Sequence, residues 1–139
     1  MKLSEVSRGA AFGDVDNDGD IDILVSNNNG PTRLLRNDLA DKQNFVELRV
    51  LDKTVKRDLF GACVRLTLGD GRILTRFVRT DGSYLSASDP RVHVAWPSSH
   101  PMRSLEIVLP DQKAVPVKGV VPGMIATVEI SPSGAEVRK

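Results

Sequence analysis

Residues 64–78 read Val64-Arg65-Leu66-Thr67-Leu68-Gly69-Asp70-Gly71-Arg72-Ile73-Leu74-Thr75-Arg76-Phe77-Val78. The first half alternates apolar and polar side chains, which is the period of a half-buried β-strand. Glycines flank Asp70, and glycine tolerates the positive φ angles that tight hairpin turns require. Residues 73–78 then return as a second apolar-rich strand. The stretch therefore predicts a β-hairpin.

The same pattern recurs through the rest of the chain. Short apolar or alternating runs occupy residues 45–50, 92–96, 105–109, 115–117 and 125–130. Gly, Pro and Asp separate these runs, and helical periodicity is scarce. Seven or more short strands at this spacing predict an all-β fold, either a β-sandwich or a small barrel. We weigh a short helix at residues 39–43 or 55–59, and we expect residues 131–139 to form a flexible tail.

Residues 14–22 carry the strongest functional pattern in the chain. They read Asp14-Val15-Asp16-Asn17-Asp18-Gly19-Asp20-Ile21-Asp22, and they hold five of the 18 acidic groups. Carboxylates gathered in this way repel one another unless a cation compensates their charge. Carboxylate and carbonyl oxygens form the ligand set that Ca²⁺ accepts. We therefore interpret the segment as a calcium loop, with a solvated acidic turn as the alternative.

The loop does not follow the EF-hand pattern. An EF-hand needs a bidentate Glu at the twelfth loop position, and that position here is Val25. The residues that follow the loop are largely β-branched, which favours a strand over a helix. We expect a calcium loop that joins two strands. The expected side-chain ligands are Asp14, Asp16, Asp18 and Asp22, and Asp20 is expected to contribute its backbone carbonyl.

Two family resemblances accompany these patterns. Residues 11–27, which read AFGDVDNDGDIDILVSN, resemble the FG-GAP/VCBS repeat, and the resemblance covers about residues 8–37. This repeat forms one blade of a β-propeller, and its equivalent loop holds calcium. The resemblance implies a propeller-blade-like calcium-loop hairpin ahead of the sandwich or barrel.

The second resemblance spans about residues 44–130. Four runs in this span are similar to the ASPIC/UnbV domain: Asn44-Phe45-Val46-Glu47-Leu48-Arg49-Val50, Gly61-Ala62-Cys63-Val64-Arg65-Leu66, Arg79-Thr80-Asp81-Gly82-Ser83-Tyr84-Leu85-Ser86 and Arg91-Val92-His93-Val94. That domain follows FG-GAP/VCBS repeats in cartilage acidic protein-like and bacterial exported proteins. The resemblance implies an extracellular or cell-surface location. Met1 to Glu5 carry no apolar signal region, so we predict no signal peptide within this chain.

These observations predict a division of the chain into four parts. We expect a calcium-loop unit at residues 1–38, a junction at 39–43, a β-domain at 44–130 and the flexible tail at 131–139. The chain has 139 residues, 40% of them hydrophobic, which suffices for one ordinary core. No apolar run approaches the roughly 18 residues that a membrane span requires.

The remaining candidate residues favour structural roles. Cys63 lies in a strand-like run and is expected to be a buried thiol. Trp96 could cap the core or stack on a sugar, and we favour the core. The turn at residues 81–84 is expected to be a hairpin tip with a packed Tyr84. We identify no catalytic residues and no residues that bind an organic cofactor.

The sequence thus predicts a non-catalytic calcium-binding adhesion or interaction module of an exported or surface protein. Its expected partner is a protein or a carbohydrate, and exposed strand edges favour a homo-oligomer. Nucleic acid is disfavoured because only 4% of the residues are aromatic, which leaves little surface for base stacking. The alternative is a metal-dependent hydrolase fragment that acts on a carbohydrate or another anionic substrate. Alternating Asp residues that all ligate one ion would leave no free base, which argues against it.

Overall fold

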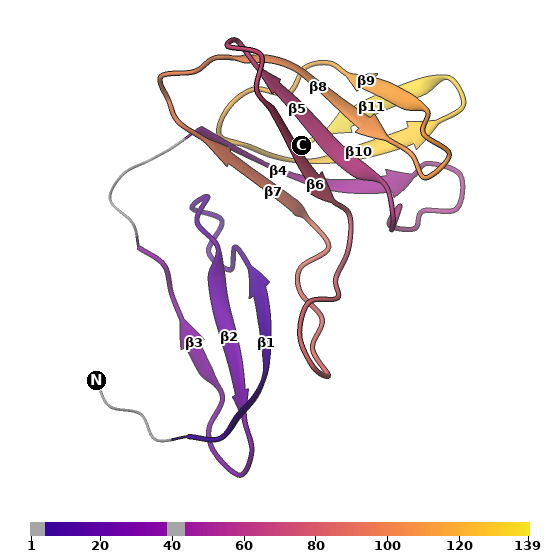
Figure 1. The fold of residues 1–139 in the computed structure, drawn as a ribbon. Coiled ribbons are helices and arrows are strands. Elements are labelled where there is room, and N and C mark those ends of the chain that lie inside the picture. Colours follow the sequence, from indigo (N-terminus) through magenta and orange to yellow (C-terminus); the bar gives the residue numbers. More distant parts are fainter. Residues whose placement is uncertain (1–4, 39–43) are drawn as a thin grey trace. The chain divides into compact units, whose positions relative to one another are not determined.

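The computed structural model describes residues 5–38 and 44–139, and every regular element within those ranges is a β-strand. The predicted all-β class is confirmed (Figure 1). The strands are β1 (Ser7–Gly13), β2 (Asp22–Asn27), β3 (Arg33–Leu35), β4 (Asn44–Asp52), β5 (Cys63–Leu68), β6 (Ile73–Phe77), β7 (Val92–Trp96), β8 (Met102–Val108), β9 (Ala114–Val117), β10 (Met124–Ser131) and β11 (Gly134–Arg138).

The chain divides into two compact units, each of which is described by itself. The acidic-loop unit contains the described residues of Met1–Ala40 together with Thr80–Asp89. Its sheet has the order β1-β2-β3 and is antiparallel throughout. The β-domain contains the described residues of Asp41–Arg79 together with Pro90–Lys139. It holds two four-stranded sheets, with the orders β11-β10-β4-β7 and β6-β5-β8-β9.

A single apolar core joins the two sheets of the β-domain. The alternating residues of β4, Val46, Leu48 and Val50, are fully buried and belong to the same cluster as Leu66 of β5 and Ile107 of β8. Strands such as β4 and β5 turn their alternate apolar residues toward this core, which explains the period-two pattern in the sequence. Of the two predicted architectures, the structure has the sandwich: in the described residues no sheet closes into a barrel.

The hairpin predicted from residues 64–78 is confirmed as β5 and β6. The two strands pair antiparallel in one continuous register that includes Leu66 opposite Leu74. Gly71 has a φ of 89°, which is the left-handed conformation that the turn requires. The backbone N–H of Gly71 donates to the carbonyl of Leu68 at 3.0 Å and closes the turn.

The expected flexible tail at residues 131–139 is replaced by a strand. β11 pairs antiparallel with β10, with Val137 opposite Val128 and Ala135 opposite Ile130. Both Ala135 and Val137 pack against the core. The run has little apolar alternation of its own, so its conformation depends on the ladder that β10 offers.

The helix weighed at residues 55–59 was also wrong. Asp52 Oδ1 accepts the backbone N–H groups of Thr54 and Val55, at 2.7 and 3.1 Å, and this holds a turn at the end of β4. Side-chain acceptors of this kind compete with the helical hydrogen bonds. The chain then bridges back, with Asp58 opposite Leu51. The other proposed helix, together with the junction at residues 39–43, lies outside the described residues.

The Thr80–Asp89 segment was predicted within the β-domain, but it contacts the outer edge of β1. Ser83 Oγ accepts the N–H of Ala10 at 3.1 Å, and Ser88 Oγ accepts that of Phe12 at 3.3 Å. The N–H of Asp89 donates to the carbonyl of Phe12 at 2.9 Å. The segment therefore supplies hydrogen-bond partners to an edge that β2 leaves unpaired.

Candidate metal site

The acidic loop connects the end of β1 at Gly13 to the start of β2 at Asp22. Asp14 is only 1% exposed, and its carboxylate organises the loop. Oδ1 accepts the N–H of Asp18 at 3.1 Å, and Oδ2 accepts that of Gly19 at 2.9 Å. Gly19 has a φ of 96° and Asn17 a φ of 60°, so the chain turns sharply at these two positions.

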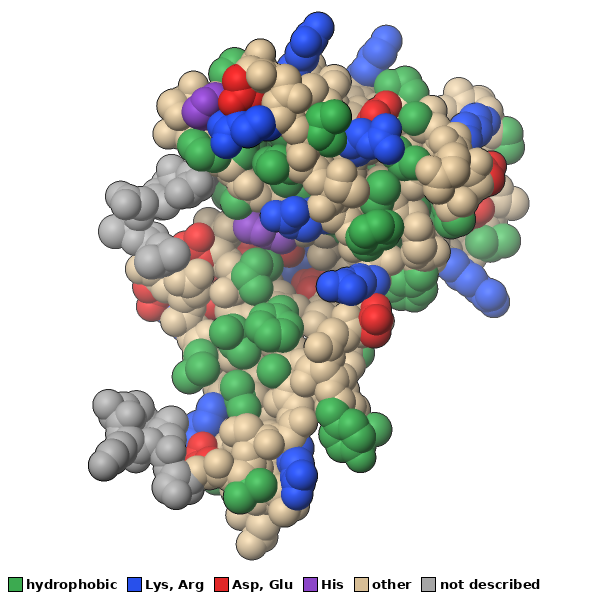
Figure 2. All heavy atoms as spheres, in the orientation of Figure 1, with side chains coloured by type: hydrophobic (Ala, Val, Ile, Leu, Met, Phe, Trp, Pro, Cys, Tyr) green, Lys and Arg blue, Asp and Glu red, His purple; other side chains and the backbone are tan. Residues whose placement is uncertain are grey.

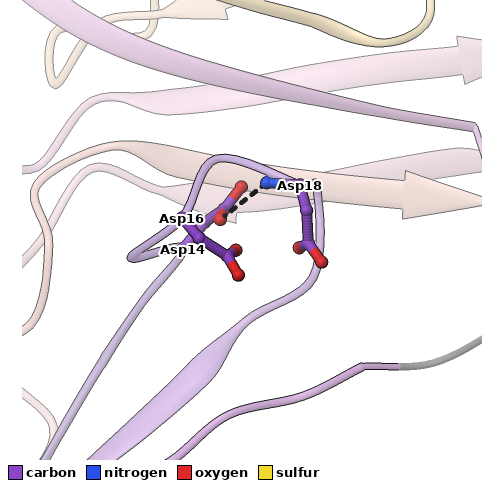
Figure 3. A group of neighbouring side chains, drawn as sticks. All are labelled: Asp14, Asp16 and Asp18. Carbon is purple, nitrogen blue, oxygen red and sulfur yellow. Dashed lines mark hydrogen bonds between the residues drawn. The ribbon is translucent and has the colours of Figure 1, made fainter.

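Three of the five predicted ligands come together in this loop. Asp14, Asp16 and Asp18 each offer one carboxylate oxygen, and these oxygens all lie within 4.8 Å of one another (Figure 3). Oxygens that bind one Ca²⁺ at 2.3–2.6 Å lie no more than about 5 Å apart. The cluster is therefore compatible in size and in donor chemistry with a calcium ion.

The other two predicted ligands lie outside this cluster. Asp22 is buried at the start of β2, and its carboxylate accepts hydrogen bonds from the acidic loop and from the segment that follows β3. Oδ2 accepts the N–H of Val15 at 2.9 Å, and Oδ1 accepts the N–H of Asn37 at 2.8 Å. These two backbone donors lower the pKa of Asp22. The backbone N–H of Asp20 donates to Asp18 Oδ1 at 3.0 Å and narrows the turn.

The surroundings of Asp16 raise the pKa of its carboxyl group. Desolvation, followed by repulsion from the Asp18 and Asp22 carboxylates, raises the pKa of Asp16. Arg36 opposes this effect, because its Nη1 lies 3.5 Å from Asp16 Oδ2. Arg36 also pairs with Asp38 at 2.7 Å. The ionised form of Asp16 is thus disfavoured in this position, and Arg36 offsets only part of that cost.

Sequence reasoning missed Arg36 as a neighbour of the acidic loop. It follows β3, whose Leu35 pairs with Ile23 of β2. That register returns the chain beside the loop. The only signal in the sequence was the apolar Leu34-Leu35 run, which suggests a third strand but not its register.

The remaining candidates have structural contacts. Trp96 is buried in the core, and its Nε1–H donates to the carbonyl of His100 at 3.0 Å, so the core interpretation is confirmed. Cys63 is buried, as predicted. Tyr84 is 69% exposed, so the expected packed tyrosine was wrong. Its turn contacts β1 through Ser83 and the backbone instead. His93 stacks on Phe45 with ring centroids 5.9 Å apart.

The visible surface shows no concentration of positive charge. Figure 2 shows Lys and Arg side chains spread among acidic, apolar and neutral ones on the face that it draws. Several of them are paired, for example Arg65 with Glu106 and Arg72 with Asp70. In the described residues, no helix is long and apolar enough to cross a membrane.

The described strands define two all-β units, a two-sheet sandwich and a three-stranded sheet that carries the acidic loop. The ASPIC and UnbV family model matches residues 52–136. The chain belongs to this family. The match extends into β11, and its first residue lies after the acidic loop.

A curated human protein is also similar to the chain. Cartilage acidic protein 1 from Homo sapiens is 33% identical over an alignment of 89 residues, and the alignment covers 58% of this chain. The match covers 13% of the human protein. The chain therefore corresponds to a small part of that relative.

Proposed function

We propose that this chain is a non-catalytic, calcium-stabilised interaction module of an exported protein. The observation that carries the proposal is the convergence of Asp14, Asp16 and Asp18 in one sharply turned loop. Desolvation, followed by repulsion from the neighbouring carboxylates, raises the pKa of Asp16, so a divalent cation would relieve part of the cost of ionising it. Bound calcium would then stabilise the native acidic-loop unit by mass action.

The two faces of the β1–β3 sheet support its interpretation as an FG-GAP/VCBS-like blade. Residues that pair across strands share a face. Ala11, Leu24 and Leu34 therefore form one apolar row, and Phe12, Ile23 and Leu35 form the other. Both rows contain exposed side chains, among them Leu24 and Leu35. A sheet that is apolar on both faces suits a place between two neighbouring sheets, as in a propeller.

The location and the partner follow from the same proposal. The similarity to cartilage acidic protein 1 favours an extracellular setting. We propose that the ligand is a protein or a carbohydrate. Binding to immobilised glycans and to extracellular matrix proteins, measured with calcium and then with a chelator, tests this part.

Thermal unfolding of the intact chain with calcium, magnesium or a chelator tests the metal. Calcium at about 100 times its dissociation constant should stabilise the fold by about 2.7 kcal/mol. Asp16→Asn and Asp18→Asn each remove one charge from exposed positions, and both should reduce the calcium response. In the chelated protein Asp16→Asn should not destabilise, because it removes repulsion. Asp81→Asn, at an exposed position outside the cluster, is the matched control.

Isothermal titration calorimetry of the metal-depleted chain with calcium measures whether the acidic loop binds the ion. Calcium binding that both cluster variants weaken and the control preserves would support the proposal. Identical melting in calcium and in chelator, with no heat of binding, would reject the structural calcium ion.

A further inference from the structure

The outer edge of β6 is open for strand pairing. In the described residues, β6 is the terminal strand of the sheet β6-β5-β8-β9, and it pairs only with β5. It is also unusually apolar for an edge. Ile73 is 59% exposed and Phe77 is 61% exposed. Open apolar edges of this kind are templates for pairing with another strand.

The register shows which backbone groups point outward. The N–H of Leu68 donates to the carbonyl of Arg72 at 2.9 Å, and the N–H of Val78 donates to the carbonyl of Ala62 at 2.8 Å. Hydrogen-bonded positions alternate in an antiparallel ladder, so every second residue between Arg72 and Val78 bonds to β5. The remaining residues direct their N–H and C=O groups away from the sheet. These outward residues are Ile73, Thr75 and Phe77.

Two other edges of the sandwich, β9 and β11, are less suited to pairing. Next to β9, the N–H of Leu109 donates to the carbonyl of Lys113. By the same alternation, Val115 and Val117 bond to β8 and Pro116 faces outward. Proline has no N–H to donate to another strand. On β11, Glu136 and Arg138 place charges within five residues. Charged side chains and proline are the features that protect sheet edges. β6 has no proline and one charged residue, Arg76.

We propose that two copies of this chain associate by antiparallel pairing of β6 with β6 about a two-fold axis at Thr75. In this register Ile73 lies opposite Phe77 of the partner subunit, and Thr75 lies opposite Thr75 of the partner subunit. The three outward residues on each strand then form hydrogen-bonded pairs. The register places Leu74 opposite Arg76 of the partner subunit, so no like charges face each other directly.

Self-complementarity identifies a second copy as the partner. Centring the pairing on Thr75 aligns all five residues of β6 and brings the two exposed apolar side chains together twice. A shift by two residues loses part of this overlap. A shift by one residue would place each outward-facing residue opposite a partner residue whose N–H and C=O point away, so the two strands could not exchange hydrogen bonds. An isologous contact of this kind closes on itself as a dimer.

Arg76 limits the association. Its Nη1 donates to the carbonyl of Thr75 at 3.0 Å, and that carbonyl is one of the outward groups. The guanidinium must move before the strands can pair. Arg76→Ala should therefore strengthen the dimer, and this sign distinguishes edge pairing from association through a charged surface.

Cysteine trapping in the full chain tests the register. Thr75→Cys should form a disulfide-linked dimer under mild oxidation, because opposed hydrogen-bonded residues have Cα atoms about 5.5 Å apart, within disulfide range. Ile73→Cys alone should not, since the two copies of residue 73 would be separated by four residues of strand, roughly 13 Å. An equimolar mixture of Ile73→Cys and Phe77→Cys should give the mixed dimer. Buried Cys63 makes the unsubstituted chain the background control.

Sedimentation equilibrium over a concentration series tests the association itself. The unsubstituted chain should show a monomer–dimer equilibrium, and Ile73→Lys should weaken dimerisation by about tenfold or more. Val55→Lys, at a similarly exposed apolar position in a turn, should leave the equilibrium unchanged. A chain that stays monomeric at millimolar concentration would overturn the proposal. So would equal cross-linking of Thr75→Cys and Ile73→Cys, or a dimer that Ile73→Lys leaves intact.

Discussion

The backbone N–H of Asp89 donates to the carbonyl of Phe12 at 2.9 Å, two residues before Asp14 begins the acidic loop. The bond places the last residue of the Thr80–Asp89 segment at the C-terminal end of β1. Ser88 Oγ accepts a hydrogen bond from the backbone N–H of the same Phe12. The strand that leads into the metal site is thus held on one side by β2 and on the other by residues far along the chain.

Gly9 should be required for this arrangement. A Cβ added there would lie 2.3 Å from Ser86 Oγ and 2.6 Å from the carbonyl oxygen of Tyr84. The backbone oxygen has little freedom to move, so Gly9→Ala should push the segment away from β1. We expect a loss of about 1–3 kcal/mol in the free energy of unfolding. Denaturant unfolding measures this loss, and hydrogen exchange should show faster exchange in residues 80–89.

Gly82→Ala is the matched control, because a Cβ at Gly82 meets no atom within 4 Å. It should be neutral or slightly stabilising. If both alanine variants behave alike, the close approach of the Thr80–Asp89 segment to β1 is not present in solution.

Trp96→Phe should destabilise the β-domain. The smaller ring leaves space in the core and removes the donor to the carbonyl of His100. We expect a cost of about 1–3 kcal/mol. Tyr84→Phe, at an exposed position, should change stability by less than about 0.5 kcal/mol. A Trp96 variant of full stability that loses glycan binding would instead favour the sugar-stacking role.

Glu5 should contribute a stability that depends on pH. Hydrogen bonds from Arg33, aided by the charge of Arg33, lower the pKa of Glu5 below 4.5. A lowered pKa in the folded state stabilises the fold above the pKa of the unfolded chain, and this stabilisation is lost as the pH falls through the folded pKa. Carboxyl-carbon NMR should therefore show Glu5 titrating below 4.5. Arg33→Gln should return the titration toward that value, and an unchanged midpoint would contradict the assigned cause.

Removal of residues 134–139 should destabilise the sandwich. The deletion takes away β11, the packing of Val137 on the core and the contact of Arg138 with buried Glu129 at 3.1 Å. A loss of at least about 2 kcal/mol follows from the lost apolar burial and hydrogen bonds. Removal of Lys139 alone is the control and should have little effect. Equal stability of the two truncated chains would restore the flexible-tail interpretation.

The sequence predicted the parts of the fold that burial encodes locally. On β4, the apolar residues alternate at Val46, Leu48 and Val50 because these side chains face the core. Gly71 marks the turn between β5 and β6 because few other residues tolerate the required φ. The same local chemistry brought Asp14, Asp16 and Asp18 together. Short-range periodicity and turn residues were sufficient for these features.

Long-range pairing was beyond such patterns. β4 lies parallel to β10, with Val46 opposite Met124, and no spacing in either segment specifies that neighbour. β11 becomes a strand only because β10 offers a ladder. Arg36 reaches Asp16 only through the register of β3. Each feature depends on a partner distant in sequence, so single-sequence periodicity could not reveal it.

The position of the Thr80–Asp89 segment bears on the order in which the chain folds during synthesis. Strands β1 to β3 leave the ribosome before the strands of the β-domain, but the residues that satisfy the outer edge of β1 follow only after β6. The sheet that carries the acidic loop is therefore translated before the β-domain, and it is completed only after β4 to β6 of that domain have emerged.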